Sequence, residues 1–421
     1  MANFSPIERL VASCLSATPG IKRIIKNTYV RINALVFARK KGGKILDPRI
    51  PAIVSVIPDE QESFYGYYDK SPVNEVGVIS HIPTISTKRA PRGTALLKIA
   101  VTSLDDGLTR VVGETFCYNW QQGARSQWLD DDLLIYNVVN SNGYSAVVKS
   151  MSTGKTVREY GMAVQDAYRT EYFLSLNYGR LMSVAPDYGY RNFSYDQVRY
   201  RELDNDGIWK VDIQSGESEL LFSFSDILSQ DFKKKVDDYY HTVNHIMISP
   251  DGRSFIFIHR YYKGQRKYHR LMYSDFETLK VLLDDEIVSH MSWLNDDVLI
   301  GYLSVNSVLG YYQIDLRSGI ITIVAGMSHL NMGDGHPSVY RDWVVFDSYP
   351  DKGRMQQLSL YNLKTKDIYP LLRLYSSVDY MGECRCDLHP RFSPDGSKIF
   401  FDSVFSGFRK HCYIDVTKIV K

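Results

Sequence analysis

Short runs of aromatic and β-branched residues, separated by tight turns, recur along most of the chain. The clearest copy lies at residues 384–403, where Phe392 precedes the turn sequence SPDG, and Ile399, Phe400 and Phe401 follow it. Glycine supplies the positive φ that such a turn needs, so this segment predicts two strands joined by a hairpin. SPDG occurs again at residues 249–252, and looser versions occur near residues 70–77, 128–132, 174–179, 293–297 and 339–343.

These seven copies lie roughly 40 to 60 residues apart, which is a spacing typical of β-propeller blades. The predicted fold is therefore all-β: a seven-bladed β-propeller with a short N-terminal helical extension. The last unit reaches only a third strand, at residues 412–420. We therefore expect residues 51–57 to pair with the strand near residues 412–417 and close the ring. The predicted domains are a helical extension at residues 1–45 and a propeller at residues 46–421.

The extension has a helical pattern instead of a strand pattern. Residues 5–15 predict one short helix, and residues 21–41 predict a second whose apolar face holds Ile21, Ile24, Ile25, Tyr29, Ile32 and Val36. The charged residues of the second helix are all basic: Lys22, Arg23, Lys26, Arg31, Arg39, Lys40 and Lys41. Such a helix can lie on an anionic membrane surface. The alternative is that it packs against the propeller or a partner.

Composition excludes several classes of function. The formal charge of +2 and the absence of a nucleic-acid-binding motif give no reason to expect a nucleic-acid partner. Five cysteines without zinc-type spacing favour a reducing, cytoplasmic location. No run of 18 apolar residues exists, so peripheral contact of residues 21–41 with the inner membrane is the remaining route to a membrane.

The seven repeats can be aligned on the first residue of each turn. Four places before it stand, in chain order, Tyr67, Arg125, Glu171, His245, His290, His336 and His389. Four consecutive repeats therefore carry histidine at one position, in a chain that has only 10 histidines. The first strand of a propeller blade lines the central channel, so we expect these seven residues to form a ring around one end of it.

This ring offers the groups needed to remove a proton beside a carboxylate: a base, a cation and an acid. The predicted catalytic residues are His245, His290, His336, His389 and Tyr67. The predicted substrate-binding residues are Arg125, Arg391, Gln122, Glu171 and Asp69. His290, His336 and His389 together could also hold a divalent metal, manganese or zinc. The alternative is that the histidines only cap strands around a water-filled channel. A Tyr- and Arg-rich insertion at residues 187–207 predicts a rim or lid over this channel, or else a plain solvated loop.

Three segments resemble the seven-bladed propellers related to oligogalacturonate lyase: WQQG at residues 120–123, GDGHPS at residues 333–338 and DLHPRFSPDG at residues 387–396. The resemblance covers about residues 50 to 420. It implies a cluster of His and Gln that binds a metal such as manganese, basic residues that neutralise a uronate carboxylate, and a base that takes the proton at C5. Where the family has a second His, this chain has Arg391, which favours a carboxylate clamp over a metal ligand.

The resemblance implies a lyase that cleaves an acidic, uronate-containing oligosaccharide or polysaccharide by β-elimination, with a bacterial surface-polysaccharide pathway as a suitable setting. An acidic glycan is then the expected partner. The alternative is a non-catalytic propeller that binds a glycan or a protein. A hydrolase that uses carboxylates is a third reading, and the available acids are Asp69, Glu171, Asp334 and Asp387.

Overall fold

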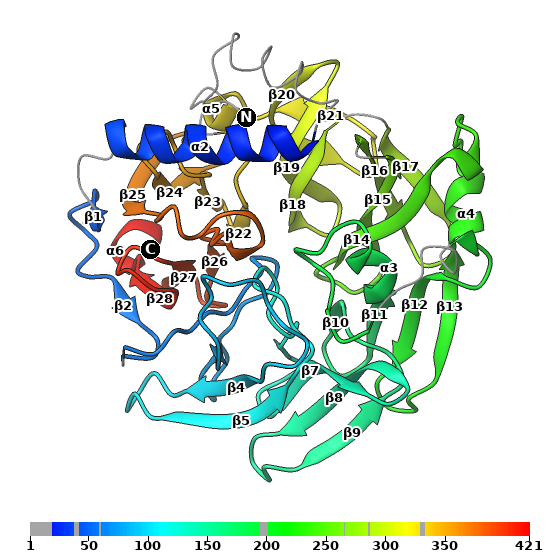
Figure 1. Cartoon of the computed structure of the whole chain (residues 1–421), viewed down its shortest axis with the longest axis horizontal. Helices are drawn as coiled ribbons and strands as arrows, with labels where there is room; N and C mark the ends of the chain where they lie inside the picture. Colours follow the sequence, from blue (N-terminus) through cyan, green and yellow to red (C-terminus); the bar gives the residue numbers. More distant parts are fainter. Residues whose placement is uncertain are drawn as a thin grey trace.

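The structure is a computed structural model that describes residues 19–37, 42–58, 60–193, 201–264, 266–284, 287–328 and 333–421. In this part of the chain, seven antiparallel sheets surround a central axis (Figure 1). The predicted seven-bladed propeller is thereby confirmed. The helix predicted at residues 5–15 lies outside the described residues. The second predicted helix is present as α2 (Pro19–Phe37).

The blades follow one another along the chain. Blade one contains β3 (Val78–Pro83), β4 (Leu97–Thr102) and β5 (Thr109–Thr115), and blade two contains β6 (Gln127–Trp128), β7 (Leu133–Asn140), β8 (Gly143–Ser150) and β9 (Thr156–Tyr160). Blade three contains β10 (Asp166–Tyr168), β11 (Tyr172–Leu176), β12 (Gly207–Asp212) and β13 (Ser218–Ser223), and blade four contains β14 (Tyr240–Ile248), β15 (Phe255–Lys263), β16 (Arg266–Ser274) and β17 (Leu279–Asp284). Blade five contains β18 (Val288–Asn295), β19 (Val298–Val305), β20 (Val308–Asp315) and β21 (Ile321–Ile323). Blade six contains β22 (Ser338–Tyr340), β23 (Trp343–Asp347), β24 (Met355–Asn362), β25 (Ile368–Tyr375) and β1 (Gly43–Ile45). Blade seven contains β26 (Arg391–Phe392), β27 (Lys398–Ser403), β28 (Lys410–Asp415) and β2 (Val54–Ser55).

In the described part of the chain, the other helices are α3 (Tyr178–Met182), α4 (Phe224–Ser229), α5 (Ala325–Ser328), α6 (Thr417–Val420) and the short 3-10 helices η3 (Val236–Asp238) and η4 (Gly382–Cys384).

The SPDG turns form for a local reason. In blade seven, Ser393 Oγ donates to the Asp395 carboxylate at 2.6 Å, and Gly396 has a φ of 71°. A side chain at Gly396 would also collide with the ring of Tyr340 from the preceding blade. Glycine is therefore required both by the backbone angle and by the close approach of the neighbouring blade.

The ring is closed as the sequence predicts. In β2, Val54 pairs with Tyr413 and Ser55 pairs with Cys412, so a strand from the N-terminal part of the chain is the outer strand of blade seven. β1 adds a fifth strand to blade six by pairing with β25. The division at residues 45 and 46 stays a prediction, although β1 of the extension is hydrogen-bonded into a blade.

The hydrophobic core is divided among the contacts between neighbouring blades. One cluster joins Leu174 and Ile208 of blade three to Val243 and Phe257 of blade four. Equivalent clusters join every other pair of neighbours, including blade seven to blade one. A fully buried Leu, Ile or Phe contributes about 1.5 to 3 kcal/mol, so stability comes from these contacts and the channel is free to hold polar groups.

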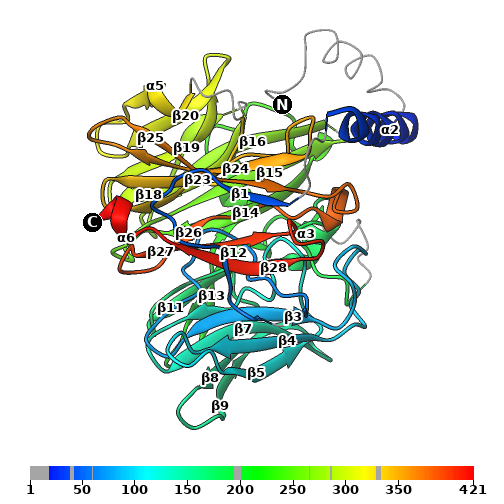
Figure 2. The same ribbon diagram turned by 90° about the vertical axis from the view of Figure 1, so that its left-hand side faces the viewer.

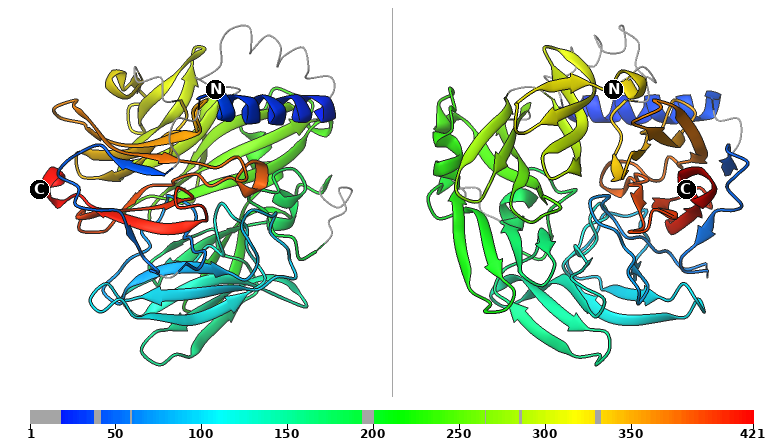
Figure 3. Two further views of the ribbon diagram at one scale, coloured as in Figure 1. Left: turned by 60° about the vertical axis from the view of Figure 1, so that its left-hand side comes forward. Right: turned by 180° about the vertical axis from the view of Figure 1, so that it is seen from behind.

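The inner strands of the blades all begin at one end of the channel, and we call this side of the molecule the mouth face. The loop between β3 and β4 of blade one (residues 84–96) and the loop between β23 and β24 of blade six (residues 348–354) also lie on the mouth face. α2 and α3 lie on this side, and α6 lies on the opposite side (Figures 2 and 3). Among the described residues, no helix is both long and apolar enough to cross a bilayer.

Candidate functional site

Four of the histidines predicted from the repeat alignment lie together at the mouth end of the channel. The ring centroids of His290 and His336 are 3.9 Å apart, those of His336 and His389 are 4.3 Å apart, and those of His245 and His290 are 6.3 Å apart. The ring of Tyr67 lies 5.1 Å from both His245 and His389. The four imidazoles are only 2% to 4% exposed. The structure therefore brings these five residues together, while their catalytic roles remain a prediction.

Backbone irregularities accompany the ring positions. Arg125, His245 and His389 have positive φ values of 52°, 53° and 46°, which side chains other than glycine rarely adopt. The pairing of β14 with β15 shifts between Asn244 and Met247, around His245. A bulge breaks the regular alternation of a strand and re-aims one side chain. Such strained positions concentrate at functional sites, because the surrounding structure must hold them.

Three of the imidazoles are fixed through Nδ1. This atom lies 2.9 Å from Asp334 Oδ1 in His290, 2.9 Å from Asp347 Oδ1 in His336, and 3.0 Å from the carbonyl oxygen of Gly66 in His389. A carboxylate or a carbonyl only accepts, so each Nδ1 carries the proton and each Nε2 keeps its lone pair. This is the arrangement in which a second group orients a metal-binding imidazole.

The charge states match this arrangement. Burial lowers the pKa of His290, and the neighbouring His336 lowers it further. Burial also holds the pKa of His245 and the pKa of His389 well below the usual value. For His336 burial acts in the same direction and is the largest single effect, but the charge and hydrogen bond of Asp347, together with the charges of Asp387 and Asp334, outweigh it, and the pKa of His336 is raised. His245, His290 and His389 are therefore neutral near pH 7 and can accept a proton or bind a cation.

A group that could hold a metal ion is formed by His336, Asp387 and His389, whose ligand atoms all lie within 4.8 Å of one another. It differs in one member from the set predicted from the sequence, since Asp387 takes the place of His290. Two imidazoles and a carboxylate are a donor set that suits manganese, zinc or iron. The sequence did carry a signal for Asp387, which lies two residues before His389 and thus on the same face of an extended strand.

The two arginines predicted to bind a substrate carboxylate are already paired inside the protein. Arg125 donates to both oxygens of Asp69, at 3.0 and 2.8 Å, and also to the carbonyl of Gln165. Arg391 donates to Asp402 at 3.2 Å and lies over the ring of Tyr65. Both arginines are buried. The clamp prediction therefore needs correction: Arg125, Asp69 and Arg391 hold the channel wall together, because their charges are neutralised by protein groups.

Of two further predicted residues, Glu171 lies away from the ring, whereas Gln122 lies beside it. Glu171 is exposed in the turn between β10 and β11 and does not join the ring. The turn of blade three lies at residues 169–171, so the alignment on Ser175 was displaced, and Gln165 precedes this turn at the ring position. Gln122 is 2% exposed near Tyr67, and neither atom of its side-chain amide has a hydrogen-bond partner among the described residues. Gln122 therefore remains available to a ligand.

Cations that face the histidines come from blades four and seven, and the repeat alignment did not identify them. The charges of Arg260 and Lys267 both lower the pKa of His245. The adjacent Arg260 in turn lowers the pKa of Lys267 to about 8. Arg385 donates to Asp387 at 2.8 Å. The sequence did contain a signal, which is the basic and aromatic segment at residues 259–270. This segment forms the end of the β15–β16 hairpin, so it does not stand four places before a turn and was not part of the repeat alignment.

The insertion predicted as a rim or lid does cover the histidines. The ring of Tyr188 lies 5.1 Å from His245, edge on. Asp187 forms an ion pair with Arg385, and Arg191 forms one with Glu383. Residues 187–193 thus extend from blade three to the η4 region across the mouth. We call residues 187–193 the cover, and its Tyr188 contributes to the burial of His245.

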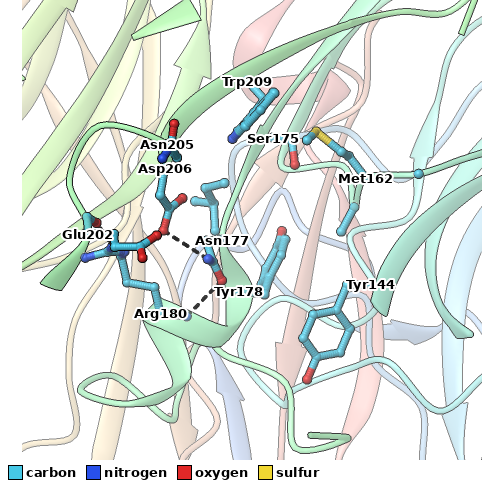
Figure 4. Close-up of a pocket in the computed structure, with 13 residues that line it drawn as sticks. Tyr144, Met162, Ser175, Asn177, Tyr178, Arg180, Glu202, Asn205, Asp206 and Trp209 are labelled. Carbon is cyan, nitrogen blue, oxygen red and sulfur yellow. Dashed lines mark hydrogen bonds and ion pairs between the residues drawn. The ribbon is translucent and has the colours of Figure 1, made fainter. Parts of the chain in front are cut away.

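Two larger cavities lie away from the histidines. One, of about 490 Å³, lies at the opposite end of the channel and is lined by Lys70, Asp166 and Arg391 among others. The other, of about 420 Å³, lies between blades two and three (Figure 4). Its polar groups are largely paired, since Asp206 accepts from Arg180 at 2.7 Å and from Asn177 at 3.0 Å. Neither of these two cavities is lined by a ring histidine.

A scan against protein-family models finds no match for this chain, and a search of curated protein sequences finds none. Solved structures do match. Oligogalacturonate lyase from Vibrio parahaemolyticus has a TM-score of 0.55 at 14% sequence identity, and the match covers 91% of this chain and 100% of the lyase. An oligogalacturonate lyase in complex with manganese has a TM-score of 0.56 at 13% identity, over 89% of this chain and 97% of the lyase. The chain therefore shares the propeller fold of these lyases over nearly its whole length.

Proposed function

We propose that the protein is a lyase that cleaves an acidic, uronate-containing oligosaccharide or polysaccharide by β-elimination, with a divalent metal, manganese, as its cofactor. One observation carries this proposal: three imidazoles fixed through Nδ1 converge beside Asp387, and a cluster of cations faces them. The likeness of the fold to an oligogalacturonate lyase in complex with manganese supports it. Zinc suits the same donor set and is the alternative metal.

His336, His389 and Asp387 are the residues that would hold the metal. A bound divalent cation would stabilise the negative charge that builds up on the uronate carboxylate as the C5 proton leaves. His290 lies against His336 and donates its Nδ1 proton to Asp334, so its Nε2 is available to a substrate hydroxyl or to the same ion. Asp347 and Asp334 keep these rings in one tautomer.

Arg260 and Lys267 are the proposed partners of the substrate carboxylate. Both carry positive charge next to His245, and Nε of Arg260 is buried without a hydrogen-bond partner among the described residues. Burial is the main cause of the low pKa of His245, and the charges of Arg260 and Lys267 lower this pKa further. Binding of a carboxylate offsets part of this positive charge, so His245 becomes more basic when the substrate is in place.

Elimination breaks the C5–H and C4–O bonds of the uronate and forms a C4=C5 double bond. Nε2 of His245 takes the proton from C5, and the hydroxyl of Tyr67 gives its proton to the departing O4 oxygen. Tyr67 Oη lies 2.7 Å from Nδ1 of His245, and the proposed step uses the tautomer of His245 in which Nδ1–H donates to Tyr67 Oη. Burial raises the pKa of Tyr67 well above its usual value, so the hydroxyl is protonated at the start. Transfer of the Nδ1 proton to the tyrosinate then leaves both groups neutral.

The test is incubation of the full chain with a panel of uronate polysaccharides, before and after removal of metal with a chelator and re-addition of manganese. We expect ultraviolet absorbance from an unsaturated product, lost with the chelator and restored by manganese. His389→Gln should abolish this signal. The matched control is His411→Gln, because His411 is equally buried and bonded to Ser80 but lies outside the ring. Saturated products, or full activity in His389→Gln, would contradict the lyase proposal.

A further inference from the structure

The apolar stripe of α2 is turned away from the propeller. Ile25, Ile32 and Val36, three members of the face predicted from the sequence, are 43%, 54% and 67% exposed, and Leu35 beside them is 84% exposed. Ala34, on the other side of the helix, is only 7% exposed and packs against the blades. Contiguous large apolar side chains in water are uncommon on a soluble protein and mark an interaction surface. Packing of this stripe against the propeller is therefore excluded.

α2 lies on the same side of the molecule as the histidines. The carbonyl of Phe37, at the end of the helix, lies next to Gly353, in the loop between β23 and β24 on the mouth face. The chain then enters blade six, where Tyr375 N donates to Gly42 O at 2.9 Å. Figures 1 and 2 show the helix crossing blades five and six on this side, at the rim of the propeller. α2 and the mouth of the site therefore lie on the same side of the molecule.

Positive charge accompanies both features. From Lys22 to Lys41 the sequence contains seven basic residues and no acid. A second basic element is the loop between β3 and β4, in which Arg89 and Arg92 are exposed. This loop projects beyond the strands on the same side as α2 (Figure 2). The basic sequence of this region, together with the exposed Arg31, Arg89 and Arg92, suits a flat, negatively charged surface better than a pocketed partner.

We propose that the mouth face docks on an anionic lipid bilayer, with the exposed stripe of α2 inserted at the interface and the basic residues on the phospholipid headgroups. An apolar stripe flanked by basic residues is the pattern of helices that lie in a membrane interface. Symmetric contact between two copies of α2 would bring like charges together. Given the proposed function, the lyase would then act on acidic glycan held at the membrane surface.

The test uses the full chain and sedimentation with vesicles. One set contains phosphatidylcholine alone, and the other contains phosphatidylglycerol and phosphatidylcholine in equal parts. We expect binding to the anionic set, weakened by salt, and roughly fivefold weaker for each basic residue lost, as in Arg31→Gln. The double variant Leu35→Ser with Val36→Ser should reduce binding by tenfold or more. The matched control is Val157→Ser, since Val157 is 60% exposed on the outer strand β9 of another blade.

The docking proposal would be overturned if the protein did not bind anionic vesicles, or if the Val157→Ser control lost as much binding as the α2 double variant. It would also be overturned if the protein were a dimer in solution and the α2 double variant were a monomer with unchanged vesicle binding. The last result would assign the stripe to a second copy of the chain. Failure of the lyase proposal is distinguishable, because activity on a soluble uronate oligosaccharide should be the same in the α2 double variant. Vesicle binding that persists without any lyase activity would leave the docking proposal standing.

Discussion

Asp347→Asn is the substitution that tests the proposed metal site most directly. The carboxylate of Asp347 is 1% exposed and accepts from three donors. These are Nδ1 of His336 at 2.9 Å, the backbone N–H of His336 at 2.7 Å and the backbone N–H of His389 at 3.2 Å. Asparagine has the same shape, but one of its two polar atoms is itself a donor. At least one of the three donors is then left facing an N–H group.

Both expected effects follow from these contacts. One buried donor without an acceptor lowers the free energy of unfolding by about 1 to 3 kcal/mol. Loss of the carboxylate also removes the group that orients His336, and such changes typically weaken metal affinity by about 10- to 100-fold. That range corresponds to about 1.4 to 2.7 kcal/mol of binding free energy. The two losses should therefore be similar in size and separately measurable.

The assay is a manganese titration of chelator-treated protein, together with urea unfolding of the metal-free form. The control is Asp166→Asn, because Asp166 is also 1% exposed and accepts a backbone N–H from the next blade, but lines the cavity at the opposite end of the channel. The control should leave manganese affinity unchanged. If Asp347→Asn is less stable but binds manganese within about twofold of the parent affinity, Asp347 is a structural carboxylate and the assignment of His336 as a ligand is refuted.

Three other predictions concern the cations around the mouth. Lys267 binds a carboxylate only when it is charged, and Arg260 lowers the pKa of Lys267 to about 8, so kcat/KM should fall as pH rises through that value. Lys267→Arg should shift this alkaline fall in kcat/KM to higher pH. A fall at an unchanged pH would exclude Lys267 as the partner of the carboxylate. Asp187→Asn removes the ion pair with Arg385, and a partly exposed ion pair contributes about 0.2 to 1 kcal/mol. Hydrogen exchange at residues 187–193 should therefore be about 1.4- to 5-fold faster in this variant. Equal exchange rates in variant and parent would show that the ion pair does not hold the cover closed. Arg391→Lys should lower the free energy of unfolding, measured in urea, by about 1 to 3 kcal/mol, because the hydrogen bonds to Gly66 and Asp402 are weakened. The KM for the substrate should be unchanged. A large rise in KM would restore the interpretation of Arg391 as a carboxylate clamp.

The sequence by itself determined the repeat and the position of the histidines. Both depend on local rules: a tight turn needs glycine or a small polar residue, and a strand alternates its two faces, so residues at one distance from the turn share one place in every blade. His245, His290, His336 and His389 obey this rule, and the structure places their rings together. Blade three was misaligned because its turn was predicted at LSLNYG, residues 174–179, whereas it lies at residues 169–171, where Arg169 adopts a φ of 49°.

Only the tertiary structure decided which charges meet. Arg125 pairs with Asp69, which lies 56 residues earlier, and Arg385 pairs with Asp187, which lies 198 residues earlier. Strand periodicity states which face a side chain occupies, but it contains no information about the partner that another blade brings to it. For this reason the sequence offered Arg391 as a free cation, whereas the fold pairs it with Asp402 and leaves Arg260 and Lys267 beside His245. In α2, periodicity likewise predicted an apolar face, but only the packing against the blades decided that this face points to the solvent, because either side of a helix can be buried.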